Sequence, residues 1–250
     1  RLLEYDDVMN SQREVIYKKR RHALLGERIG VDIANNMYDV CETLVEEHKE
    51  ANDLEGFRMD VLKYFAVDFD IKEEDFQKTS ADNLTERLYK EVRDTFSRKT
   101  ETIAKQAFPV IKNVFEQRGE MFKNIVVPFT DGKRAYNVVA NLEKTYKSEG
   151  EELIRAYEKS IMLAHIDDAW KEHLREMDDL KQSVQNATYE QKDPLLIYKF
   201  ESFNLFKSMV DKINKNVVST LMKGQIPFEA PEEVKQAEEK RTDLSKMRTG

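Results

Sequence analysis

Three pairs of adjacent aspartates are the side chains whose type and spacing most directly suggest chemistry. The pairs are Asp6-Asp7, Asp167-Asp168 and Asp178-Asp179. In a helical protein, paired carboxylates can hold the magnesium of a diphosphate substrate when a further carboxylate follows one helical turn later on the same face. Those later positions are occupied by Asn10, Lys171 and Gln182. The sequence therefore argues against an enzyme that acts on magnesium diphosphates.

Histidines are the next candidates, because two of them share one predicted helix. His165 and His173 lie about 80° apart around the helix axis. Periodicity supplies no further metal ligand, so each is expected to bond to a neighbouring side chain. None of the four histidines follows a glutamate by three residues, which excludes the di-iron pattern. Asp68 and Asp70 begin like a calcium loop, but Glu73 stands where the turn requires glycine. No metal site is predicted.

Sequence motifs for nucleotide binding and hydrolysis are missing from the chain. No G-x-x-x-x-G-K-[ST], G-x-S-x-G or H-E-x-x-H pattern occurs. Gly132-Lys133 has neither the earlier glycine nor the following hydroxyl of a phosphate loop. We therefore assign no catalytic residue and no cofactor to this chain, and expect that it is not an enzyme by itself.

Composition points to long, solvated helices. The 250 residues are 40% hydrophobic and 36% charged, with 8 glycines and 5 prolines. A net charge of −7 gives no overall attraction to nucleic acid. Cys41 is the single cysteine, which excludes an internal disulfide and fits a reducing compartment. No apolar run reaches the roughly 18 residues of a membrane span, and no signal peptide pattern begins the chain. We expect a protein that is soluble or binds a membrane peripherally.

The element that organises the rest of the chain runs from Glu151 to Met222. Apolar residues at three- and four-residue steps predict one long helix from Glu151, with an S-x-x-E capping box at Ser148. A second helix is predicted from Asp193-Pro194 to the residue before Gly224. Two helices of similar length joined by a short polar link must lie antiparallel if each is to bury its row of apolar residues against the other. The result is a two-helix hairpin.

Large side chains on the two stripes are expected to form the core of this hairpin: Trp170, Leu174, Met177 and Phe206. Truncation of Trp170 to alanine would cost roughly 3 to 5 kcal/mol if the ring is fully buried. The polar link carries one aromatic residue, Tyr189. This amphipathic side chain either packs back on Val184 or Leu195, or contacts a partner.

The N-terminal part of the chain is predicted to be helical throughout. A helix is already under way at Arg1, and a second one is capped by Asp32. Shorter helices follow over 57–65 and 72–79. A longer helix then begins at Ser80 or Asp82.

Pro109 either kinks this longer helix or begins the next one. A small β-hairpin is predicted near residues 124–139, because two β-branched runs flank Asp131-Gly132. Pro128 has no N–H to donate to a neighbouring strand, so its strand is expected at a sheet edge. A short helix over 138–146 leads back to the two-helix element. The predicted fold class is mainly α with one small β-hairpin.

Two ordered groups of residues resemble the SecA family, the ATPase motors of bacterial preprotein translocation. The run L-L-E-Y-D-D-V-M-N over 2–10, continued by Gln12-Arg13 and Ile16-Tyr17, resembles the helical scaffold signature of the family. Three further runs resemble its two-helix finger: I-D-x-x-W-K-E-H-L-x-x-M-D over 166–178, Y-x-Q-K-D-P over 189–194 and Y-K-x-E-x-F over 198–203.

The resemblance implies a division of the chain into four parts. These are a helical scaffold over 1–48, a helical wing over 49–148, the two-helix finger with a returning scaffold helix over 149–228, and a charged linker over 229–250. The scaffold and finger match closely, whereas the wing matches only by position. The hairpin is an elaboration without a counterpart in the general pattern.

The resemblance also implies partners. In the family, ATP and magnesium bind between two motor domains that this chain lacks, and the finger enters the SecY channel, where its tip aromatic touches the translocating chain. Tyr189 falls at that tip. The implied partners are the SecYEG channel, the preprotein, the protein's own motor domains and an anionic membrane surface. The implied location is the cytoplasm, peripherally at the inner membrane. The family's usual Cys/His zinc tail is missing, since Cys41 is the single cysteine.

Two other function classes stay open on the sequence. The first is a non-catalytic helical adaptor that docks on another protein, which a binding assay against SecYEG would distinguish. The second is a magnesium-dependent enzyme of the isoprenoid-synthase type, which a magnesium titration of the aspartate pairs would test.

Overall fold

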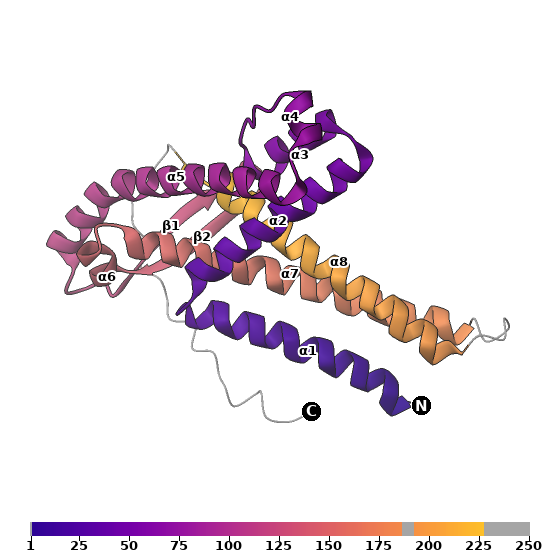
Figure 1. Cartoon of the computed structure of the whole chain (residues 1–250). Helices are drawn as coiled ribbons and strands as arrows, with labels where there is room; N and C mark the ends of the chain where they lie inside the picture. The colour runs from indigo at the N-terminus through magenta and orange to yellow at the C-terminus, as the bar shows by residue number, and fades with distance from the viewer. Residues whose placement is uncertain (1, 187–192, 228–250) are drawn as a thin grey trace.

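The computed structural model describes residues 2–186 and 193–227. These residues form eight helices and one two-stranded antiparallel sheet (Figure 1). The prediction of a mainly α fold with a small β-hairpin is confirmed. The elements in chain order are α1 (Leu2–Leu25), α2 (Ile29–Ala51), α3 (Leu54–Phe65), α4 (Glu73–Lys78), α5 (Ala81–Arg118), β1 (Asn124–Thr130), β2 (Ala135–Asn141), α6 (Leu142–Lys147), α7 (Glu151–Asn186) and α8 (Pro194–Lys223).

Helices α7 and α8 are the predicted two-helix hairpin. They lie side by side, and α1 runs alongside their outer part (Figure 1). Asp193 caps α8 as predicted, because its carboxylate accepts a hydrogen bond from the Leu195 N–H at 3.0 Å. Gly224 ends the helix.

The predicted capping box at the start of α7 is wrong in detail. The Ser148 hydroxyl accepts from the N–H of Glu152 at 3.0 Å, one position beyond the glutamate of the expected S-x-x-E pattern. The shift arises because Glu149 and Gly150 both have positive φ, 51° and 99°, and turn the chain between α6 and α7. A Cβ at residue 150 would lie 3.1 Å from Ala104, so glycine also permits close packing against α5.

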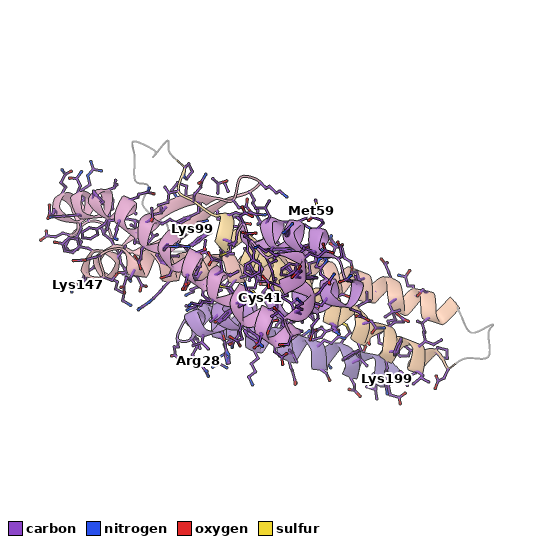
Figure 2. All side chains as sticks on the ribbon, turned by 45° about the horizontal axis from the view of Figure 1, so that its top comes forward. Arg28, Cys41, Met59, Lys99, Lys147 and Lys199 are labelled. Carbon is purple, nitrogen blue, oxygen red and sulfur yellow. The ribbon has the colours of Figure 1, made fainter. Side chains whose placement is uncertain are left out.

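Helix α1 lies along the outer half of the hairpin and forms a small second core with it. Met177, Val184 and Tyr198 are buried there, and Tyr5 of α1 contacts Tyr198 with ring centroids 4.7 Å apart. The larger core lies where α2, α3 and α5 cover the inner half of α7 and α8. Figure 2 shows Cys41 in this interior, and its side chain is fully buried.

Several predicted helix boundaries in the N-terminal half of the chain differ from the structure. Helix α2 begins at Ile29, and Asp32 lies in its first turn instead of capping it. The helix expected from residue 57 begins at Leu54, because the Asp53 carboxylate accepts from the Gly56 N–H. Ser80 caps α5.

Helix α5 continues through Pro109 without a break. A proline removes the hydrogen bond to the carbonyl four residues earlier, here Lys105. Both residues lie on the exposed face of α5, where water can solvate the freed carbonyl. The alternative in which Pro109 begins a new helix is therefore wrong.

The β-hairpin follows the predicted pattern, with Val127 opposite Val138 and Phe129 opposite Tyr136. The Asp131 carboxylate accepts from the N–H groups of Lys133 and Arg134 and so fixes the turn. The short helix expected from 138 begins only at Leu142, since residues up to 141 belong to β2.

Candidate functional site

The candidate site is the two-helix hairpin together with the elements that hold it. Its predicted contact residue, Tyr189, lies outside the described residues. Geometry is therefore available for the shaft of the hairpin and for its base, where α7 and α8 meet the β-hairpin. Both regions bring together residues far apart in the sequence.

The predicted core residues do not share one environment. Met177 is buried in the small core beside α1. Trp170, Leu174 and Phe206 are only partly buried. The Trp170 ring meets Tyr17 of α1 edge-on at 6.5 Å and His173 at 5.5 Å. Trp170 therefore packs at the junction between the hairpin and α1, not within the hairpin alone.

A buried chain of hydrogen bonds crosses this junction. His173 Nε2 of α7 lies 2.7 Å from Gln12 Oε1 of α1, and Gln12 Nε2 donates to the Ser202 carbonyl of α8 at 3.0 Å. All three residues are buried. Because side chains from α1 and α7 and the backbone of α8 take part, these bonds tie both arms of the hairpin to the N-terminal helix.

The last acceptor, the Ser202 carbonyl, sets the donor and acceptor roles in this series of hydrogen bonds. A carbonyl only accepts, so the Gln12 amide nitrogen must face Ser202 and its oxygen must face His173. His173 then donates from Nε2, which makes Nδ1 the unprotonated nitrogen of a neutral ring. Nδ1 is buried and has no hydrogen-bond partner. Burial lowers the pKa of His173 below its ordinary value, consistent with a neutral ring.

At the base of the hairpin, Thr220 of α8 joins three elements. His165 Nε2 of α7 lies 2.8 Å from the Thr220 hydroxyl, which approaches the Asp131 carboxylate in the β-hairpin turn at 3.5 Å. The Tyr157 hydroxyl donates to the Thr220 carbonyl at 3.0 Å, and its ring stacks on Phe129 at 4.2 Å. The expectation that His165 and His173 bond to neighbouring side chains is confirmed.

Two of the aspartates that could have bound magnesium are paired with arginines. Asp167 accepts from Arg20 of α1 at 2.7 Å, and Asp168 accepts from Arg134, the residue before β2, at 2.5 Å. Such half-exposed pairs contribute about 1 kcal/mol at most. Within residues 2–186 and 193–227, no group of three or more acidic, histidine or cysteine side chains is arranged to hold a metal ion.

Comparison with known proteins assigns these elements to a family. The family model described as "SecA Wing and Scaffold domain" matches residues 1–225. The chain belongs to the SecA family. It is 50% identical over 259 residues to the protein translocase subunit SecA of Porphyromonas gingivalis W83, and 53% identical over 258 residues to that of Bacteroides thetaiotaomicron. Each alignment covers 99% of this chain and 23% of the relative, so the chain spans about a quarter of the relatives' length.

A third relative, the SecA subunit of Flavobacterium psychrophilum, is 54% identical over 227 residues, which cover 91% of this chain and 20% of that protein. The resemblance drawn from the scaffold and finger runs is thereby confirmed. All eight helices and both strands of the described chain fall within the residues that this family model matches. No helix in the described part of the chain is long and apolar enough to cross a membrane.

Sequence reasoning missed the residues that join the two-helix hairpin to its neighbouring elements. Gln12 belongs to the run that resembles the scaffold signature, Ser202 occupies an unspecified position of the 198–203 run, and Thr220 lies in no motif. Each is a small or amide-bearing side chain on an apolar helix face. A polar residue in such a position signals an internal hydrogen bond, but its partner lies on another helix and is not readable from spacing.

Proposed function

We propose that this chain is the scaffold, wing and finger region of a SecA translocase motor, and that it transmits ATP-driven motion to a preprotein in the SecYEG channel. The observation that carries this proposal is the buried link from Gln12 to both finger helices, in a chain of the SecA family. A lever must be stiff at its joint. Buried hydrogen bonds between the helices resist sliding, because a shift would leave further polar groups unsatisfied in the core.

The finger tip is the proposed contact with the moving polypeptide. Tyr189 combines a large apolar ring with a polar end, so it can grip many sequences without selecting one. In the full-length protein, Tyr189→Ala is expected to abolish most translocation into SecYEG vesicles while ATP binding persists. Tyr189→Phe is the matched control and is expected to retain activity. Unchanged translocation by Tyr189→Ala would remove the tip from the mechanism.

ATP and magnesium are proposed to bind in motor domains outside this chain. The chain by itself should then neither bind nor hydrolyse ATP. Isothermal titration of the 250-residue chain with magnesium-ATP is expected to give only heats of dilution. Saturable binding of magnesium-ATP to the 250-residue chain would contradict the proposal that nucleotide binds only in the motor domains.

The proposed location is the cytoplasm, with peripheral attachment to the inner membrane through SecYEG and anionic lipid. The net charge of −7 offers no general attraction to such a surface or to nucleic acid. We therefore expect binding to anionic vesicles only when SecYEG is present in them.

A non-catalytic helical adaptor is the second candidate function. It is favoured by an apolar stripe near the outer end of α8, where Leu196, Phe200 and Phe203 are largely exposed at helical spacing. Exposed apolar residues of this kind could contact either the wall of a channel or the surface of a partner protein. The two functions differ in one measurement: once the motor domains are restored, the SecA proposal requires affinity for SecYEG, whereas the adaptor requires none.

A further inference from the structure

An apolar groove of about 840 Å³ lies between α5 and β1, next to the C-terminal end of α8. One wall is a face of α5 that includes Ile103, Val110 and Val114, and the other is the outer edge of β1. Its charged lining residues within the described chain are Arg98 and Lys99, both basic. Figure 2 shows Lys99 beside the end of α8, where its amine donates to the Met222 carbonyl. The size and apolar character are those of a ligand site.

The chain itself enters this groove after α8. Gln225 and Thr130 exchange both backbone hydrogen bonds, each 2.8 Å long, so the segment begins to pair with β1 as a third strand. Ile226 and Pro227 follow and line the groove. The described residues end at Pro227, inside the groove wall.

Strand pairing cannot continue beyond that point. In an antiparallel ladder, hydrogen-bonded pairs recur at every second residue. The pair after Thr130 and Gln225 is Pro128 with Pro227, and neither residue has an N–H to donate. Anything that holds the next residues in the groove must therefore act through side chains.

We propose that this groove binds Phe228 and the acidic residues that follow it in the same chain. Consecutive Cα atoms are 3.8 Å apart, so Phe228 starts within one residue of the groove lining. It is the one aromatic residue in 228–250. The groove would anchor its ring against α5, and Arg98 would face Glu229, Glu232 or Glu233. The C-terminal segment would thereby leave the molecule along the wing and not along the finger.

Photo-crosslinking in the full 250-residue chain tests the proposal. Benzoylphenylalanine replaces Val110, a half-exposed groove residue, and mass spectrometry maps the adducts. We expect intramolecular adducts with residues 228–233. Phe228→Ala should lower their yield about tenfold, because the buried ring supplies most of the affinity, whereas Phe228→Trp should retain them. Benzoylphenylalanine at Met59, an exposed residue of α3, is the matched control and should not reach the tail.

The other possible occupants give different results. Adducts between two chains, rising with protein concentration, would assign the groove to a second copy. Adducts that form only after an unfolded apolar peptide is added would assign it to a foreign polypeptide. Either result, or a tail adduct unaffected by Phe228→Ala, would overturn the proposal. None of these outcomes bears on the finger or on SecYEG.

Discussion

His173 Nε2 and Gln12 Oε1 lie 2.7 Å apart in a buried position, joining α7 to α1 across 161 residues of sequence. The Ser202 carbonyl fixes the Gln12 amide, and the amide fixes the histidine tautomer. Helix α1 and both helices of the α7–α8 hairpin thus share one set of hydrogen bonds. Two of the predictions below concern these hydrogen bonds directly.

Removing the glutamine should weaken the joint measurably. Gln12→Ala leaves the buried His173 donor without its acceptor, which costs roughly 1 to 3 kcal/mol of unfolding free energy. Urea denaturation gives the value. Arg13→Ala, next to it on the exposed face of α1, is the control and should change stability by about 0.5 kcal/mol or less. Equal effects of the two variants would mean that the buried bonds carry no stability.

Acid should weaken the same joint. The folded-state pKa of His173 lies below the ordinary value of 6.5 because the ring is buried. Between the two values the unfolded chain binds the proton more readily, so the contribution of His173 to stability is full above about pH 6.5 and is lost as pH falls. The stability difference between the native chain and His173→Asn should therefore shrink from pH 7.5 to pH 5.5. A difference that is constant over this range would refute the assignment.

Glu158 should behave in the opposite sense. Burial raises the pKa of this α7 carboxyl to about 7, against the attraction of Arg93 and Arg155. Its contribution is therefore full below about pH 4.5 and is lost as pH rises through 7. Glu158→Gln should stabilise the chain at pH 8, by at most about 3 kcal/mol, and have little effect near pH 4.5. Thermal melts at the two pH values measure this, and a destabilised variant at pH 8 would show that the charge is compensated.

The close contact at the end of α8 should be sensitive to one methyl group. A Cβ on Gly224 would collide with the Tyr157 hydroxyl. Gly224→Ala should cost roughly 1 to 3 kcal/mol, in the range of overpacked sites. In a Tyr157→Phe background the added cost should be smaller, because the colliding oxygen is gone. Additive losses in the double-variant cycle would locate the strain elsewhere.

Much of the α7–α8 pair and of the β-hairpin is predictable from the sequence, because local signals determine where these elements begin and turn. Asp193-Pro194 begins α8 and Asp131-Gly132 turns the hairpin, each through bonds to its own neighbouring backbone. The start of α2 is not predictable in this way, since Arg28 provides no capping bond. Pro109 is a second case in which a local rule fails. A proline usually ends or kinks a helix, but α5 is exposed to water at this point, and water can solvate the carbonyl that loses its hydrogen bond.

The hydrogen bonds that join α1 to α7 and α8 could not be predicted from spacing. Gln12, His173 and Ser202 come from three helices, and nothing local to any of them specifies the other two. Trp170 illustrates the same limit. Its place on the apolar stripe predicts contact with α8, yet its ring meets Tyr17 of α1, which only the tertiary packing brings there.

The most direct test of the account is whether residue 189 touches a preprotein in transit. A photo-crosslinker replaces Tyr189 in the full-length protein, which is combined with SecYEG vesicles, ATP and a preprotein arrested partway through the channel. The account predicts an adduct between residue 189 and the preprotein that requires both SecYEG and ATP. Normal translocation without any such adduct would contradict it.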